Sequence, residues 1–183
     1  MLKGILTRWI DGFERQWGYD AGYMRDVIRV SPGSLVKFAL GTRAANPKAA
    51  PPEALFAATL VGVLAEDCGP CTQLGVDMAV AGGLDREVIR AVLAGDEAAM
   101  GETASLAFRF AHASLARDMA AADPLRDEIV RRWGEKALVA ISLSLVASRM
   151  YPTLKYALGH GKTCSRVIVD GVAAPAAHVE LAA

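Results

Sequence analysis

Residues 52–96 read PEALFAATLVGVLAEDCGPCTQLGVDMAVAGGLDREVIRAVLAGD, and they carry the clearest structural signal in the chain. Pro52 suits the first position of a helix, and an apolar stripe at helical spacing follows it. Gly82-Gly83 is typical of a helix end, and Asp85 then predicts the N-cap of another short helix. We therefore expect consecutive helices here, with the CGPC sequence of residues 68–71 at the N-terminus of the middle one.

Helical spacing also dominates the rest of the chain. Two prolines mark expected breaks: Asp123-Pro124 caps a segment that ends at Trp133, and Pro152 kinks or ends the last long helix. Residues 164–170 favour an extended conformation, as a lone strand with no evident partner. Further helices are expected at residues 2–13, 21–30, 32–42, 101–119 and 135–149, with a turn or helix at 151–158. The predicted fold class is all-α.

The chain of 183 residues is long enough for one domain with a substantial core. Apolar residues make up 53% of it, which excludes intrinsic disorder for most of its length. We expect a single helical domain over residues 1–170 and a flexible C-terminal tail at residues 171–183.

Charge and hydropathy exclude several partners. The chain has 20 basic and 20 acidic residues, so its formal net charge is zero. It therefore lacks the basic footprint of a nucleic-acid binder and has little attraction for an anionic membrane surface. The longest uncharged stretches, 54–65 and 137–148, are shorter than the roughly 20 residues that a membrane span needs. A balanced, alanine-rich composition favours self-association, so we expect a homo-oligomer.

The N-terminus and the cysteine count indicate the compartment. Arg8 and Asp11 interrupt any apolar core of a signal peptide, so a reducing cytoplasm is expected. Three cysteines, an odd number, do not form a structural disulfide framework. A close cysteine pair in that compartment points instead to catalysis, redox chemistry or metal binding.

Cys68 and Cys71 are the most informative residues. A thiol at a helix N-terminus lies near unpaired backbone N–H groups and the positive end of the helix dipole, which favour the thiolate. The second cysteine, one turn later, can attack a mixed disulfide or sulfenic acid on the first. Pro70 fits the first turn, where its missing N–H is not needed.

Other readings of this cysteine pair remain. A zinc site would need two more ligands, for which His160 and Cys164 offer a single loose pair. Two buried inert cysteines are a simpler alternative. CGPC is also the thioredoxin sequence, but thioredoxin places it after a strand in a βαβ unit. The apolar helical stripe before Cys68 excludes the thioredoxin fold, so only the thiol–disulfide chemistry of the motif is carried over.

The neighbourhood of the pair resembles the alkylhydroperoxidase D and carboxymuconolactone decarboxylase family. The similarity consists of a Cys-x2-Cys, a helix with small residues, a Gly-Leu turn and a short acidic helix, here around Cys68, Cys71, Gly83-Leu84 and Glu87. It is best over residues 51–96 and extends more loosely to 161. The resemblance implies an all-helical domain, assembly as trimers or hexamers (a dimer is the alternative), and reduction of peroxides. It also implies that Cys71 attacks the peroxide.

The chain departs from the family in its proton relay. Peroxidase members have a histidine four residues after the second cysteine and a glutamate twelve residues before the first. Those positions are Gly75 and Phe56 here, and neither side chain can carry a proton. We consider Glu66 and His160 as replacements: Glu66 is close in sequence to Cys68, and His160 lies in a glycine-flanked loop that could reach the pair.

These observations lead to three functional hypotheses. The first is an enzyme, a peroxidase or thiol–disulfide oxidoreductase, that uses Cys68 and Cys71, with Glu66 and His160 as further site residues. Its partners would be a peroxide or disulfide and a thiol reductant, with no metal or organic cofactor. The second is a decarboxylase-type enzyme that uses a proton-transfer site. The third is a non-catalytic helical oligomer, structural or ligand-binding, with a cavity lined by Phe56, Leu60 and Met78.

Overall fold

The computed structural model describes residues 1–161 and 167–174, and this part of the chain is almost entirely helical. The predicted all-α class is confirmed. The helices are α1 (Leu2–Trp17), α2 (Gly22–Val30), α3 (Pro32–Gly41), α4 (Pro52–Leu64), α5 (Gly69–Ala81), α6 (Arg86–Ala94), α7 (Gly101–Leu115), α8 (Met119–Trp133) and α9 (Glu135–Ala157), followed by strands β1 (Val167–Val169) and β2 (Val172–Ala174).

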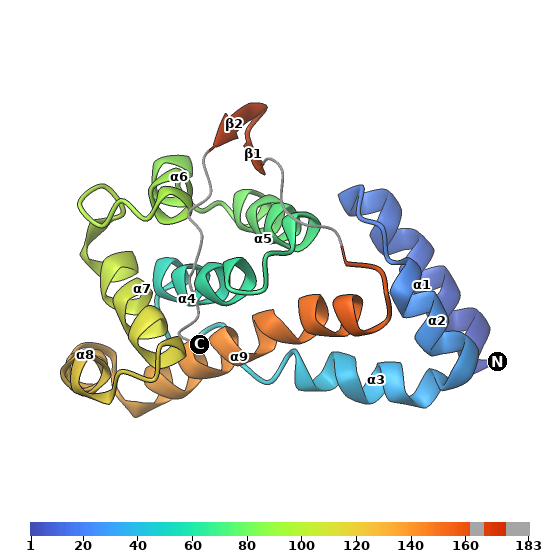
Figure 1. The fold of residues 1–183 in the computed structure, drawn as a ribbon, viewed down its shortest axis with the longest axis horizontal. Helices are drawn as coiled ribbons and strands as arrows, with labels where there is room; N and C mark the ends of the chain where they lie inside the picture. The colour runs from blue at the N-terminus through green and yellow to red at the C-terminus, as the bar shows by residue number, and fades with distance from the viewer. Residues whose placement is uncertain (162–166, 175–183) are drawn as a thin grey trace.

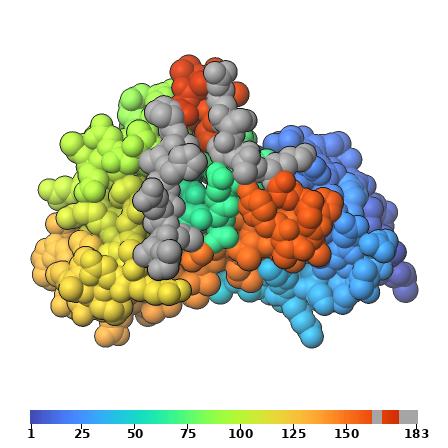
Figure 2. All heavy atoms as spheres, viewed as in Figure 1, coloured from blue at the N-terminus to red at the C-terminus, as the bar shows by residue number. Residues whose placement is uncertain are grey.

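Helix α4 is the centre of the molecule (Figure 1). It lies against α7 and α9, its main partners, and also contacts α5 and α6. Most of its side chains are buried, as expected for a helix that is apolar on every face. Helices α1–α3 form one end of the molecule, and α7 and α8 form the other (Figures 1 and 2). The site described below lies where α1 and α2 meet this central bundle.

The core has two parts. The larger one joins α4 to α6, α7 and α9 around residues such as Leu60, Ile89 and Ile141. The smaller one joins the N-terminal helices to the start of α5, and it contains Tyr19, Cys68 and Cys71. The cysteine pair is therefore part of the contact that holds α1 and α2 onto the bundle.

Helices α4 and α9 approach each other closely at Gly62. A methyl group added there would lie 2.7 Å from the backbone oxygen of Leu145 and would overlap Ser148 Oγ. Glycine is therefore required by space at this crossing, because any other side chain would push the two backbones apart.

The expected helix start at Asp123-Pro124 is wrong, and Pro152 does not end its helix. Helix α8 begins at Met119, where Asp118 caps it by accepting a hydrogen bond from the Ala121 N–H (3.0 Å), and it runs through Pro124. Helix α9 likewise continues through Pro152 to Ala157. A proline inside a helix removes one backbone hydrogen bond. Pro152 itself is buried, and packing of both helices against their neighbours offsets that loss.

The predicted lone strand has a partner. Strand β1 pairs antiparallel with β2, with Val167 opposite Ala174 and Val169 opposite Val172, so part of the expected loose tail is a strand. Val167 and Val169 are buried in the main core. The Gln73 amide on α5 binds Ile168 twice, donating to its carbonyl (2.8 Å) and accepting from its N–H (2.7 Å). This contact holds the hairpin on α5. Cys164 and His178 lie outside the described residues.

Among the described residues, α9 is the one helix that is long and apolar enough to cross a membrane by length and composition alone. In the fold it contacts α4, α7 and α8 along its length. Val139 and Val146 on its other side are exposed.

Candidate redox site

Cys68 and Cys71 lie at the N-terminus of α5, as the sequence predicts. Cys68 has an extended backbone and is the N-cap residue, while Cys71 lies in the first turn after Pro70. The two form a disulfide with a Cα–Cα distance of 5.3 Å. Cys68 is completely buried and Cys71 is 7% exposed. The two cysteines therefore lie at disulfide distance, and Cys71 is the more exposed of the two.

A short turn between α4 and α5 positions the pair. Its last residue, Asp67, has a left-handed backbone (φ 47°), a conformation that aspartate tolerates better than most residues. The Tyr156 hydroxyl on α9 donates a hydrogen bond to the Asp67 carbonyl (2.7 Å). The turn that leads into Cys68 is thus anchored to the longest helix.

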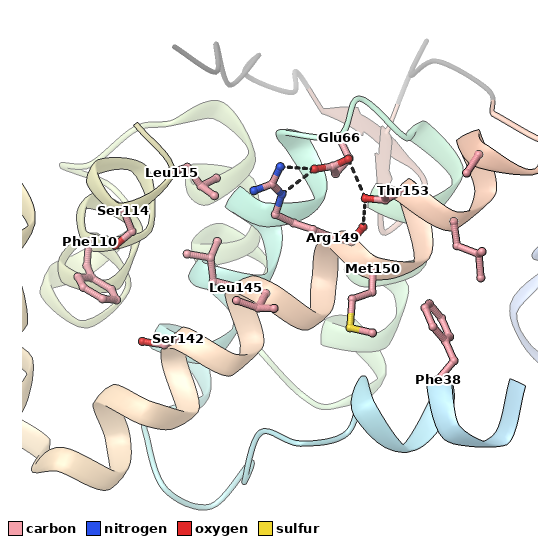
Figure 3. A pocket seen from close by; sticks show the side chains of 13 residues that line it. Phe38, Glu66, Phe110, Ser114, Leu115, Ser142, Leu145, Arg149, Met150 and Thr153 are labelled. Carbon is pink, nitrogen blue, oxygen red and sulfur yellow. Dashed lines mark hydrogen bonds and ion pairs between the residues drawn. The ribbon is translucent and has the colours of Figure 1, made fainter. Parts of the chain in front are cut away.

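The structure does not bring Glu66 to the sulfur atoms. Its carboxylate points to α9, where Arg149 Nε donates to it (2.6 Å) and the Thr153 hydroxyl donates to its other oxygen (3.0 Å) (Figure 3). These contacts lie in an open groove of about 720 Å³ along α9, which Leu145 and Met150 also line. The attraction of the Arg149 charge and the sharp turn at Asp67 explain why the Glu66 carboxylate faces α9, and a role for it at the cysteines stays a prediction.

We expect Glu66→Gln to leave the cysteine chemistry unchanged and to lower the free energy of unfolding by about 1 kcal/mol. The amide keeps the shape of the side chain but loses the negative charge that faces Arg149. Because Arg149 is partly exposed, the loss of stability is that of a charged hydrogen bond weakened by solvent. Urea unfolding and the alkylation rate of the reduced protein would measure the two effects. If the variant keeps its stability but its cysteines are alkylated at a different rate, Glu66 does act at the redox site.

His160 reaches the site only indirectly. It follows the end of α9, where its N–H donates to the Lys155 carbonyl (2.9 Å). Its Nε2 lies 2.9 Å from Asp26 Oδ2, and this hydrogen bond is the main reason why the pKa of Asp26 is lowered. The ring centroid lies 6.4 Å from that of Tyr23. The predicted histidine therefore contacts a neighbour of the cysteines rather than the cysteines themselves.

Two tyrosines that sequence reasoning missed adjoin the pair. The Tyr19 hydroxyl lies 3.5 Å from Cys71 Sγ and 3.3 Å from the Tyr23 hydroxyl. Gly18 ends α1 with a left-handed backbone, so the chain reverses at Tyr19 into α2. Both tyrosines are buried, as is Lys155, whose Nζ lies 4.6 Å from the Tyr19 ring centroid. The Tyr-x3-Tyr spacing was visible in the sequence, but nothing there linked it to a cysteine 52 residues away.

A cavity of about 350 Å³ opens beside Cys71. Its walls are mostly apolar and aromatic, and Gly75 and Met78 of α5 contribute to them. A methyl group added at Gly75 would meet no atom within 4 Å, so the missing side chain leaves open space there. Of the three residues expected to line a cavity, Met78 lines this one, while Phe56 and Leu60 are buried in the main core. Residues from five helices and two connections line it, including Trp9, Phe13, Tyr19, Tyr23, Arg43, Thr59 and Tyr151.

Within residues 1–161 and 167–174, no three His, Cys, Asp or Glu side chains gather closely enough to hold a metal ion. Cys164, a candidate zinc ligand, is outside this range. Comparison with protein-family models, curated proteins and solved structures finds no match to the chain. The resemblance to the alkylhydroperoxidase D family thus depends on the sequence alone, chiefly on residues 51–96.

Proposed function

We propose that this protein is a thiol-based peroxidase, similar to alkylhydroperoxidase D, that cycles Cys68 and Cys71 between dithiol and disulfide. The observation that carries the proposal is the position of Cys71: it is in the first turn of α5 and in the wall of a cavity large enough for a small organic molecule. The helix N-terminus favours the thiolate, and the cavity gives a substrate access to it.

The reaction has two steps in the protein. The Cys71 thiolate attacks the outer peroxide oxygen, so that an S–O bond forms, the O–O bond breaks, and the alkoxide leaves and takes up a proton. Cys68 then attacks Cys71 Sγ, the S–S bond forms, and hydroxide leaves as water. The two thiol protons appear in the alcohol and the water. An external dithiol restores the pair and is itself oxidised to a disulfide.

The burial of the two sulfurs supports this order. Cys71 borders the cavity, whereas Cys68 is completely buried beneath it in the smaller core. A buried thiol cannot meet a bulky peroxide first, but it can reach a sulfenic acid one turn away, since the Cα atoms are 5.3 Å apart. We therefore assign Cys71 the attack on the peroxide and Cys68 the resolving step.

The cavity favours an apolar organic hydroperoxide over hydrogen peroxide as substrate, because its aromatic walls bind apolar groups. An organic disulfide is the alternative. A cytoplasmic location would supply the thiol reductant, and no metal or organic cofactor is part of the cycle. Exposed apolar side chains on α1 and α9, Leu2, Ile5, Val139 and Val146, offer surface for the expected homo-oligomer.

The experiment that tests this function follows peroxide loss and free thiols in the same sample. Reduced protein is mixed with cumene hydroperoxide, with and without dithiothreitol. We expect loss of two thiols per peroxide without the reductant and repeated turnover with it. A pair that neither oxidises nor consumes peroxide would contradict the proposal.

Gly75→Phe tests whether the cavity is the peroxide site. A ring at this position would extend into the open space one turn after Cys71. We expect the KM for cumene hydroperoxide to rise about tenfold, since a filled pocket loses the contacts of one aromatic group. Oxidation by hydrogen peroxide, which needs little room, should change much less. Gly75→Ala is the control, and an unchanged KM in Gly75→Phe would place the organic substrate elsewhere.

The same cavity supports a second candidate function, binding of a small apolar molecule without chemistry. The cysteines distinguish the two candidates. If the protein only binds a ligand, binding measured by calorimetry should persist in a Cys68→Ser/Cys71→Ser variant, and the wild-type protein should show no peroxide turnover.

A further inference from the structure

The Tyr19 hydroxyl, 3.5 Å from Cys71 Sγ, is a second protein group at the reacting sulfur. We propose that Tyr19 is a catalytic residue whose hydroxyl donates a hydrogen bond to the Cys71 thiolate. It would act at the sulfur where Gly75 offers no polar side chain. The inference relies on the proposed function for the use of that thiolate, but the hydrogen bond itself can be tested separately.

The two tyrosine hydroxyls form a chain that ends on the sulfur. Burial raises the pKa of Tyr19, so its hydroxyl keeps its proton at neutral pH. Burial also raises the pKa of Tyr23, whose hydroxyl lies 3.3 Å from that of Tyr19. If Tyr23 donates to the Tyr19 oxygen, the Tyr19 proton is directed to Cys71. Each hydroxyl then has a partner, as buried polar groups require.

The Tyr19 ring is held in place on several sides. Phe13 meets it edge-on with ring centroids 5.9 Å apart, and Lys155 Nζ lies 4.6 Å from its centroid. Only 5% of the residue is exposed. A donor that is already oriented needs no rearrangement when charge develops on its acceptor, which makes its hydrogen bond more effective than one from water.

The chemistry explains why such a donor is useful. A disulfide or thiol sulfur is a weak acceptor, whereas a thiolate accepts a charge-assisted hydrogen bond. A bond to the charged form stabilises the thiolate relative to the thiol. When the S–O bond forms, the charge passes to the alkoxide, which takes its proton from solvent while Tyr19 retains its own.

Tyr19→Phe tests the proposal by titration of a single thiol. In a Cys68→Ser/Cys164→Ser background, the absorbance of the thiolate at 240 nm reports the pKa of Cys71. We expect Tyr19→Phe to raise this pKa by about one unit, the usual size of one hydrogen bond to a charged group. The alkylation rate at neutral pH should fall only about threefold, because a thiolate of higher pKa is intrinsically more nucleophilic.

Two further variants sharpen the test. Tyr151→Phe removes a hydroxyl from the same cavity, where it accepts from Thr42 Oγ1 (3.3 Å), and should leave the pKa of Cys71 unchanged. Tyr23→Phe should raise it by less than Tyr19→Phe does. Circular dichroism confirms that each variant is folded. An unchanged pKa in folded Tyr19→Phe, or an equal rise in Tyr151→Phe, would overturn the proposal.

Failure of this inference and failure of the proposed function give different results. If Tyr19→Phe raises the pKa but wild-type protein does not consume peroxide, the hydrogen bond stands and the peroxidase proposal fails. If wild-type protein consumes peroxide and Tyr19→Phe has an unchanged pKa, the function stands and the role of Tyr19 fails.

Discussion

Cys71→Ser is expected to abolish thiol-dependent reduction of cumene hydroperoxide, with a loss of at least about a thousandfold, as for the removal of other catalytic nucleophiles. The reason is access: Cys71 lines the cavity, while Cys68 is completely buried and cannot replace it. Cys68→Ser should still perform the first step and accumulate one sulfenic acid per chain. Mass spectrometry after dimedone labelling would detect this product on Cys71.

Cys164→Ser is the control for this pair of variants, because it removes a thiol without touching the CxxC. It should retain the peroxide turnover of the wild-type protein. A sulfenic acid on Cys68 in the Cys71→Ser variant, with none on Cys71 in the Cys68→Ser variant, would reverse the assigned roles. If both single variants still react with the peroxide, the reaction takes place outside the pair.

Gly62→Ala is expected to lower the free energy of unfolding by about 3 kcal/mol, the upper end for overpacking in a core. The added methyl group would lie 2.7 Å from the backbone oxygen of Leu145. The Ser148 side chain can rotate away, but the Leu145 carbonyl belongs to α9 and can move only with that helix. Urea unfolding followed by circular dichroism would measure the change.

Gly75→Ala is the matched control, since it places the same methyl group in a helix but meets no atom within 4 Å. Replacing glycine by alanine in a helix stabilises it by about 0.5–1 kcal/mol. The two variants should therefore change stability in opposite directions. A loss of less than about 1 kcal/mol in Gly62→Ala would mean that α4 and α9 separate without strain.

Local patterns predicted the helices well where local physics determines them. The start of α4 at Pro52 and the cap of α6 at Asp85, whose side chain accepts from the Glu87 N–H (2.8 Å), agree with the structure. The same reasoning placed a helix start at Pro124, which lies inside α8, and allowed a helix end at Pro152, which lies inside α9. A proline penalty is local, but the burial that offsets it depends on contacts with other helices, and a sequence pattern does not show those.

The sequence by itself determined the all-α fold and the position of Cys68 and Cys71 at a helix N-terminus, because caps, breakers and apolar spacing act over a few residues. Only the tertiary structure decided what surrounds the cysteines. It brought Tyr19 to Cys71, turned Glu66 to Arg149 and placed Ile168 of β1 against Gln73 of α5. These contacts join residues or surfaces that the packing of separate helices brings together, and the packing depends on the shape and burial of the whole chain.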